Sequence, residues 1–140
     1  MKKLNLILIL LSTALVSLPS YADWSEGYIY FEDRGNELDV VVHYIDTDRI
    51  REVNGQVYYW QLQDHSAVTY IETVSGAMSY VAYYKGDCDL MRSQRLSIRS
   101  YLGRMGEGDF TENNIPRPWR FHYPDSVGET LLKFVCDFIK

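Results

Sequence analysis

The residues of this sequence that could do chemistry are few: two cysteines, Cys88 and Cys136, and three histidines, His43, His65 and His122. Neither cysteine lies in a CxxC pair or beside a histidine, and the histidines lack the short spacings of zinc ligands. No serine stands in a GxSxG nucleophile elbow. The sequence therefore predicts a protein that is not an enzyme, with no catalytic residue, no metal ligand and no cofactor-binding residue.

The role of the two cysteines depends on the compartment, which the start of the chain indicates. Residues 1–3 are basic at two positions, an apolar run follows, and Ser20-Tyr21-Ala22 offers the small residues that a signal peptidase reads. The alternative is a transmembrane anchor, but the run is shorter than the ~20 apolar residues that span a bilayer. We therefore expect residues 1–22 to be a signal peptide, cleaved before Asp23.

Export brings the cysteines into oxidising surroundings, where a pair is more often a disulfide than two free buried thiols, which are the alternative. The pair is Cys88 with Cys136, and it closes a loop of about 49 residues. On the chain-entropy model such a bond stabilises the fold by about 4 kcal/mol. No cysteine lies near the cleavage point, so we expect a soluble, non-lipidated mature chain without a membrane anchor, in the periplasm or at the cell surface.

Removal of the signal peptide leaves residues 23–140, which have the size of one domain and contain no linker or repeat. Loss of Lys2 and Lys3 changes the formal net charge from -5 to -7. An acidic domain repels phosphate groups. Neither nucleic acid nor an anionic membrane surface is therefore expected as a partner.

Short runs rich in β-branched and aromatic residues fill most of this domain, and Gly, Asn and Asp bound them, which is typical of antiparallel strands. Asn54-Gly55 is a residue pair that tight hairpin turns prefer. The runs are GYIYFED, LDVVVHYI, QVYYWQLQ, AVTYIETV, MSYVAYY and RLSIRSYLG.

Alternation along two of these runs assigns side chains to opposite faces. Tyr58, Trp60 and Leu62 are predicted to share one face. In the run that begins at Arg95, regular alternation predicts that Leu96, Ile98 and Leu102 face one way. It predicts the other face for Arg95, Ser97, Arg99 and Tyr101.

The last 15 residues, 126–140, have the pattern of an amphipathic helix. Ser126 and Glu129 form a capping box, and Pro124 discourages an earlier start. Cys136 lies at the margin of the apolar stripe, where it could reach a strand end that carries Cys88. The stripe comprises Val127, Leu131, Leu132, Phe134, Val135, Phe138 and Ile139. The predicted fold class is α+β, an antiparallel β-sheet of about six strands with a C-terminal α-helix packed on one face and joined to it by a disulfide.

Tyrosine is unusually common, with 12 in the chain. Alternation forces some of the strand tyrosines onto the face that the helix does not cover, where large rigid side chains with a polar tip suit an interface. The alternative is that they belong to the core or to a second packed layer. The candidate binding surface comprises Tyr28, Tyr30, Tyr58, Tyr83 and Tyr101.

Several segments in the same order together resemble the surface-adhesin protein E family of Gram-negative bacteria. They are HYIDTDRIR, Trp60 in the following strand, GDC at 86–88, RLSIRSYLGRMGEGD and the ending PWRFHYPDSVGETLLKFVC. The resemblance covers most of the mature chain. It implies an antiparallel sheet with a C-terminal helix joined to it by a disulfide, and an outer-membrane adhesin that forms dimers and binds host matrix proteins such as vitronectin and laminin.

Two functions follow as hypotheses. The first is an exported, non-enzymatic binding module that contacts a host matrix protein or an envelope partner through its tyrosine-bearing face, with a homodimer expected. The second is a periplasmic housekeeping or inhibitor protein that uses the same scaffold on a bacterial partner. The absence of a lipid-anchoring cysteine favours the periplasm, so localisation separates the two hypotheses.

Overall fold

The structure is a computed structural model that describes residues 24–34, 37–69 and 76–140, with the backbone alone described at 24–34, 37–39 and 67–69. The expected signal peptide, residues 1–22, lies outside the described residues. The elements are β1 (Trp24–Arg34), β2 (Glu37–Asp46), η1 (Thr47–Arg49), β3 (Arg51–Val53), β4 (Gln56–Thr69), β5 (Ala77–Asp87), β6 (Arg92–Tyr101), η2 (Arg104–Gly106), β7 (Phe110–Asn113), β8 (Arg120–Phe121) and α1 (Val127–Phe138).

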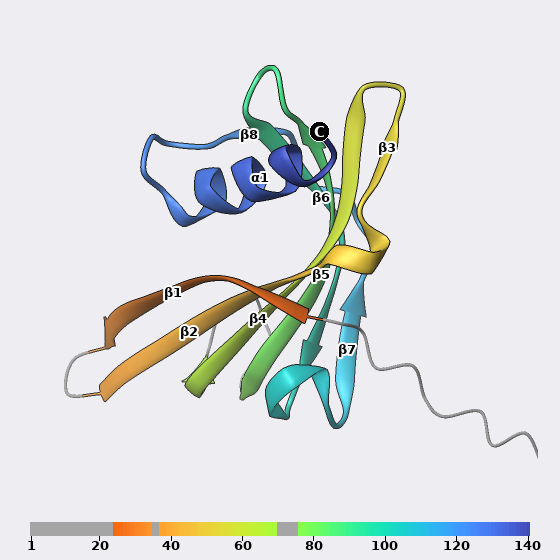
Figure 1. Ribbon diagram of the computed structural model, residues 1–140. Helices are drawn as coiled ribbons and strands as arrows, with labels where there is room; N and C mark the ends of the chain where they lie inside the picture. Colours follow the sequence, from red (N-terminus) through yellow and green to blue (C-terminus); the bar gives the residue numbers. More distant parts are fainter. Residues whose placement is uncertain (1–23, 35–36, 70–75) are drawn as a thin grey trace, which may run out of the picture.

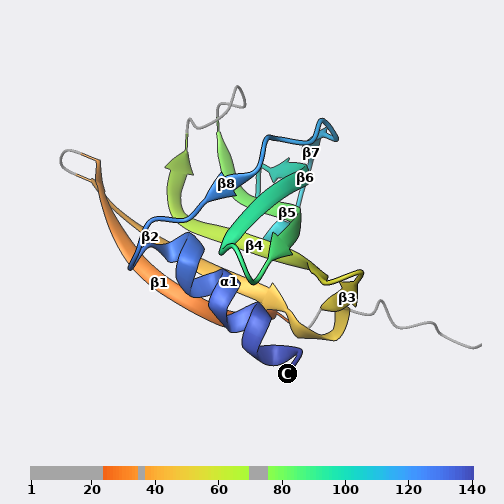
Figure 2. The same cartoon turned by 90° about the horizontal axis from the view of Figure 1, so that it is seen from above.

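The strands form one antiparallel sheet that curls strongly, with α1 lying across one face (Figures 1 and 2). Its continuous path runs β1-β2-β4-β5-β6-β7, while the short strands β3 and β8 pair with β4 and β6. The predicted α+β class, with about six main strands and one C-terminal helix, is confirmed. No helix in the described part of the chain is long and apolar enough to cross a membrane.

The β3–β4 hairpin turns where the sequence predicts it. Asn54 and Gly55 have φ values of 52° and 75°, the left-handed conformation at both central residues that a two-residue hairpin requires. Val53 pairs with Gln56 directly across the turn. The hairpin therefore fixes the register of β4, the strand that supplies residues to both faces at the centre of the sheet.

Strand β6 departs from the regular alternation expected of it. Arg95 pairs with Tyr84, but the next paired residue is Ser97, opposite Tyr83, so Leu96 is an extra residue in a β-bulge. The prediction that Arg95 shares a face with Arg99 and Tyr101 is therefore wrong. The bulge reverses the alternation and puts Arg95 on the same face as Ile98, the face on which α1 lies.

The terminal helix begins with the predicted cap at Ser126. The Glu129 side chain, however, bonds the backbone of the residue before the cap and not that of the cap itself. The Glu129 N–H donates to Ser126 Oγ at 3.2 Å, whereas Glu129 Oε2 accepts from the Asp125 N–H at 2.8 Å. The helix buries a narrower face than the predicted stripe. Phe134 and Phe138 are 36% and 53% exposed, because the helix turns its Cys136 edge toward the sheet. Its buried residues are Leu131, Leu132, Val135 and Cys136.

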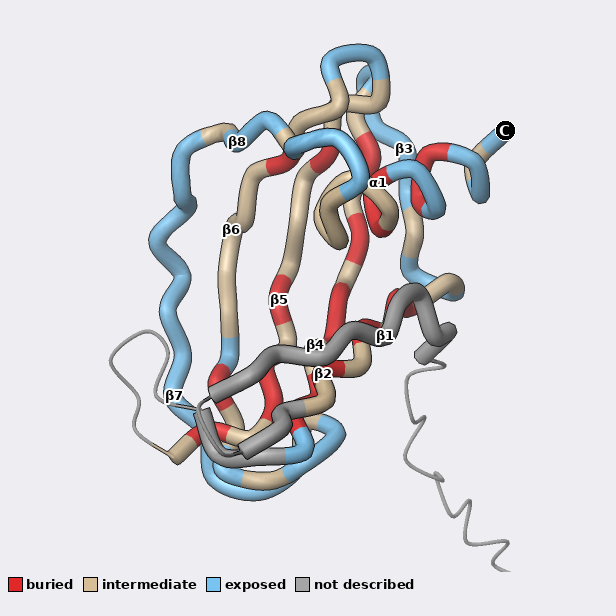
Figure 3. The backbone as a smooth tube through the Cα atoms, turned by 90° about the vertical axis from the view of Figure 1, so that its left-hand side faces the viewer, coloured by how far each residue is buried: buried red, intermediate tan, exposed pale blue. Residues whose placement is uncertain are grey.

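The hydrophobic core lies between this helix face and strands β2 and β4. Ile45, Val57 and Tyr59 pack from the sheet against Leu132 and its neighbours on the helix. Gly86 in β5 is the point of closest approach. A methyl group there would lie 2.6 Å from Leu132 Cδ1, so glycine is needed for the helix to sit this near the strand. Figure 3 shows buried segments along β4 and β5 in the middle of the sheet.

The disulfide joins the two parts of the core. Cys88 follows β5 directly and bonds Cys136 near the end of α1, with the Cα atoms 5.9 Å apart and a sequence separation of 48. The predicted pairing is confirmed. The bond holds the last turn of the helix to the β5–β6 connection, while the cap at Ser126 fixes the first turn.

Candidate interaction face

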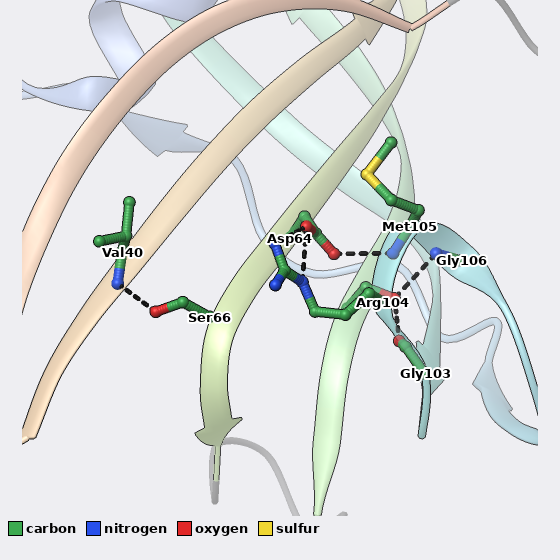
Figure 4. A network of polar contacts seen from close by, with 8 residues as sticks. Val40, Asp64, Ser66, Gly103, Arg104, Met105 and Gly106 are labelled. Atoms are coloured by element: carbon green, nitrogen blue, oxygen red, sulfur yellow. Dashed lines mark hydrogen bonds and ion pairs between the residues drawn. The ribbon is translucent and has the colours of Figure 1, made fainter.

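The sheet face opposite α1 is covered over one half by the β6–β7 connection, which contains η2. Asp64, only 1% exposed, accepts from Arg104 Nε at 2.8 Å and from the Met105 N–H at 2.7 Å (Figure 4). Ser79 Oγ donates to the Gly103 carbonyl at 2.6 Å and accepts from the Gly106 N–H at 2.9 Å. These bonds fix η2 over the β4–β5 pair and leave the other half of the face open.

On the open half, the side chains of β4 and β5 form an aromatic row. Trp60 stacks on Tyr83 with ring centroids 4.6 Å apart, and Tyr83 lies 6.1 Å from Tyr58. Antiparallel register explains the contacts, because Trp60 pairs with Tyr83 and Tyr58 is the diagonal neighbour. All three rings are partly exposed. The pairing pre-orders them, so little side-chain freedom remains to be lost on binding.

Trp119 extends this row toward β6. The Lys85 ammonium lies 4.9 Å from the Trp119 ring centroid, and the Arg92 guanidinium lies 4.7 Å from the same centroid. Lys85 pairs with Tyr58 across β4 and β5, so the rings and cations are continuous. Both distances fall within the range of cation–π attraction. We name this set of residues the aromatic face: Tyr58, Trp60, Tyr83, Lys85, Arg92 and Trp119.

The segment before α1 runs along the edge of β6 and positions Trp119 there. The Arg117 N–H donates to the Arg95 carbonyl at 2.8 Å, and Gln94 Nε2 donates to the Arg117 carbonyl at 2.8 Å. Two residues beyond Trp119, Phe121 pairs with Arg92 and is 62% exposed. The segment thus adds one partly buried ring and one well exposed ring to the margin of the face.

An ion pair with Asp87 holds Arg92 in its position in the aromatic face. Arg92 Nη2 lies 3.1 Å from Asp87 Oδ2. The pKa of the Asp87 carboxyl is lowered, first by the backbone N–H of Leu90 and then by Arg92. Because Asp87 stays ionised, it holds the guanidinium over Trp119. In a chain of net charge -5 this face still presents two cations beside aromatic rings, a combination that suits an acidic or aromatic protein surface.

The five candidate tyrosines lie in different parts of the sheet. Tyr58 and Tyr83 are in contact within the aromatic face. Tyr101 lies on the same side of the sheet but at the opposite end of β6, where it packs on Phe110 at 5.3 Å. Tyr28 and Tyr30 lie in β1, opposite His43 and Val41, and their side chains are outside the described residues. The row therefore contains two of the five.

Sequence reasoning placed Trp60 beside Tyr58 but did not assign Trp119, Lys85 or Arg92 to the surface. Lys85 could have been found from period 2, since it follows Tyr83 by two residues in one strand. Trp119 gave no such signal, because it lies between strands in an irregular segment. In the described part of the chain, no group of His, Cys, Asp or Glu is arranged to hold a metal ion.

The curled sheet with one helix bound to it by a disulfide defines the class of protein. The family model described as surface-adhesin protein E matches residues 32–137, and the chain belongs to this family. Membership is consistent with a non-enzymatic, adhesin-like protein of the cell surface. No curated protein matches the sequence.

Solved structures of Haemophilus influenzae protein E share the fold. One crystal form has a TM-score of 0.59 at 18% identity, covering 88% of this chain and 98% of that one. A second structure has a TM-score of 0.56 at 18% identity, covering 86% and 91%. A structure of protein E from non-typeable Haemophilus influenzae has a TM-score of 0.53 at 18% identity, covering 79% and 76%. At this identity the likeness concerns the fold alone.

Proposed function

We propose that the protein is an exported, adhesin-like binding module that contacts a protein partner through its aromatic face. The observation that carries this proposal is the row of rings Trp60, Tyr83 and Tyr58, which Lys85 connects to Trp119, on the part of the sheet that neither α1 nor η2 covers. Aromatic and arginine side chains dominate the energy of protein interfaces. The face offers both kinds, already ordered by mutual contact.

The expected partner is a host matrix protein, with vitronectin and laminin as the first candidates because the family resemblance implies them. The test is binding of the purified protein to each immobilised matrix protein, measured by biolayer interferometry. Trp119→Ala removes the ring that the two cations flank, and Lys85→Glu reverses one of those charges. Each change should weaken binding by at least about tenfold, the effect of losing an interface hot spot.

A matched control comes from the far end of the chain. Lys140→Glu makes the same charge change as Lys85→Glu, at a residue that lies beyond α1 and pairs with the nearby Asp137 at 2.6 Å. It should leave binding unchanged. Equal loss in both lysine variants would indicate general charge attraction, and full binding by Trp119→Ala would exclude the aromatic face as the contact surface.

The second candidate function is a periplasmic housekeeping or inhibitor role on a bacterial partner. It is motivated by the expectation that the mature chain is not lipidated, because no cysteine stands near the expected cleavage point. Protease treatment of intact cells separates the two functions. Digestion of the protein on intact cells favours adhesion, whereas protection until the outer membrane is opened favours the periplasmic role.

Processing is part of the same proposal. Residues 1–22 act as a signal peptide, and the mature protein begins at Asp23 without lipid. Intact-mass measurement of the protein recovered from the cell envelope tests this step. A retained Met1 or an added acyl mass would contradict it.

We also propose that the mature domain forms a homodimer through its sheet. Strand β7 (Phe110–Asn113) is an edge strand whose residues are all exposed, and unprotected edges tend to pair. Family resemblance supports the same arrangement. Light scattering at micromolar concentration should report twice the single-chain mass, and particles of only ~14 kDa, the size of one domain, would contradict it.

A further inference from the structure

His122 lies at the junction between the sheet and the start of α1. Its backbone N–H donates to the Met91 carbonyl at 3.3 Å, and its ring Nε2 lies 2.9 Å from Ser93 Oγ on β6. The Nδ1 edge of the ring touches the first turn of the helix. A methyl group on Gly128 would lie 2.6 Å from His122 Cε1, so glycine is needed there to leave room for the ring. The imidazole is therefore held between β6 and α1.

The hydrogen bonds around this ring suit a neutral imidazole. Ser93 is 5% exposed and also bonds the hydroxyl of Tyr59, which is 2% exposed. Burial raises the pKa of Tyr59, so this residue remains a phenol that donates its proton. With Tyr59 donating to Ser93, the Ser93 hydroxyl donates to His122 Nε2, which assigns the acceptor role to that nitrogen. A proton added at Nε2 would take the acceptor away from the Ser93 hydroxyl and would place a charge in a half-buried site.

The charges nearest to His122 also oppose a positive ring. Arg120 lies two residues earlier, and the first N–H groups of α1 present the positive end of the helix dipole. Glu129 favours a positive ring, but its carboxylate already accepts from the Asp125 N–H and pairs with Lys133 at 3.1 Å. Burial, and then Arg120, lowers the pKa of His122, and Glu129 offsets only part of this change. Mild acid therefore strains the contacts that this ring makes.

The pocket beside the ring supplies no negative charge. It has a volume of about 220 Å³, and no described residue that lines it carries a carboxylate. A cavity of this size has room for water, so the ring can exchange protons with solvent while the fold stays intact. The other titratable side chains of this pocket are His43, Tyr59 and Tyr84, and Arg95 on β6 lines the adjoining pocket.

His122 also anchors the segment that carries Trp119. The segment is held to β6 at one end by the Arg117 N–H, which donates to a strand carbonyl at 2.8 Å, and at the other end by His122. Between these anchors, β8 is only two residues long and both residues are exposed. Few buried contacts therefore hold the segment in place. Loss of the His122 anchor would let Trp119 move away from the two cations of the aromatic face.

We propose that His122 is a positioning residue for the aromatic face and that acid controls it, because protonation of its ring releases the segment 117–122 from β6 and displaces Trp119. At neutral pH the uncharged ring keeps Trp119 beside its cations. The consequence is that partner binding through the aromatic face weakens in mildly acidic surroundings. That consequence rests on the function proposed above, whereas the movement of Trp119 is a property of the domain alone.

The movement is tested by two-dimensional NMR of the isotope-labelled protein between about pH 7.5 and about pH 5, the range in which histidine titrates. The ring signals of His122 and the indole N–H signals of the tryptophans are followed together. The Trp119 signal should shift with the same midpoint as the His122 ring, below pH 6.5, while the Trp60 signal stays in place. A His122 ring that stays neutral, a Trp119 signal that does not follow it, or common movement of both indole signals would overturn the proposal.

Charge variants separate titration of His122 from a merely structural role. Arg120→Gln should move the midpoint to higher pH. Glu129→Gln, which keeps an acceptor for the capping bond, should move it to lower pH. Arg51→Gln is the matched control, since this exposed arginine pairs with Tyr58 on the opposite face of the sheet and should leave the midpoint unchanged. The same midpoint in all of these proteins would contradict the assignment.

Partner binding is then compared near pH 7.5 and near pH 5.5 with the matrix protein that binds at neutral pH. The wild-type protein should bind at least about tenfold more weakly in acid, the effect of losing an interface hot spot. His122→Gln should bind equally at both pH values, and its Trp119 signal should not move. If this variant does not fold, the two charge variants decide. Failure of every matrix protein to bind would reject the proposed function, whereas the NMR titration would still decide the role of His122.

Discussion

On the face covered by α1, Ile45, Val57 and Tyr59 are almost fully buried and meet the helix at the close approach over Gly86. On the opposite face, Tyr58 and Trp60 alternate with Val57 and Tyr59 along β4. These two rings and that of Tyr83 in β5 remain partly exposed. Both faces are rich in aromatic rings, so composition does not distinguish them. What distinguishes them is the covering: one face is closed by a helix that a disulfide retains, whereas the other is closed only where η2 binds Asp64 and Ser79. The covered face should govern stability and the open face should govern binding.

Removal of the disulfide should have the largest effect. The double change Cys88→Ser with Cys136→Ser frees a loop of 48 residues' separation and should lower the free energy of unfolding by about 4 kcal/mol. Urea unfolding followed by circular dichroism measures this loss. Wild-type protein in reductant is the control and should match the variant. An unchanged midpoint would mean that the helix stays on the sheet without the bond.

Truncation of the helix should depend strongly on which side of the helix is changed. Leu132→Ala removes a fully buried side chain and should cost roughly 3 kcal/mol through lost burial and a residual cavity. Phe138→Ala removes a larger side chain that is 53% exposed, and it should cost under about 1 kcal/mol. Thermal and urea unfolding of both variants give the comparison. Equal losses of unfolding free energy in the two variants would mean that the helix turns a different side toward the sheet from the one described.

Acid should destabilise the protein through the covered face. Burial lowers the pKa of His43 from 6.5 to about 4, so between these pH values the unfolded chain binds a proton that the folded chain does not. Stability should therefore fall as the pH drops through this window, by up to about 3 kcal/mol from His43. His122, whose pKa is also lowered, first by burial and then by Arg120, acts in the same direction.

The pH effect is checked by urea unfolding at a series of pH values. His43→Gln should flatten most of the slope between pH 6.5 and about 4, the window set by the pKa of His43. Asp87→Asn is the control from the open side. The backbone N–H of Leu90, and then Arg92, lowers the pKa of the Asp87 carboxyl, which moves its titration away from this window, so most of the slope should remain. A slope that is the same in all three proteins would show that His43 is not its source.

The smallest effect on stability is expected on the open face. Trp119→Ala removes a ring that two cations flank at its surface, and it should cost about 1 kcal/mol or less. The same change is expected to weaken partner binding severely. Parallel unfolding and binding measurements on this one variant test the division between the two faces. A loss of several kcal/mol in the free energy of unfolding would indicate that Trp119 belongs to the core and not to the binding surface.

Local signals in the sequence were sufficient for several parts of the fold. The turn at Asn54-Gly55 and the cap at Ser126 depend on neighbouring residues alone, so propensity identified them. The Cys88–Cys136 bond followed from compartment and cysteine number.

Features that depend on tertiary contacts were missed. The stripe of α1 was drawn too wide, because the sequence does not tell which edge of an amphipathic helix turns toward the sheet, and Phe134 and Phe138 proved exposed. The bulge at Leu96 gave no pattern of its own, so Arg95 was assigned to the wrong face. The position of Trp119 depends on backbone bonds from Arg117 to β6, which no periodicity encodes.

The extra residue in β6 has a consequence at the level of the gene. A deletion of the single codon for Leu96 would restore strict alternation, and residues 92–95 would exchange sides relative to the rest of the strand. Ser93 would leave its place beside His122, Arg95 would leave the face on which α1 lies, and Arg92 would leave the ring of Trp119. One small in-frame deletion inside a strand would thus disrupt a contact near the start of α1 and the aromatic face together, although the two lie on opposite sides of the sheet.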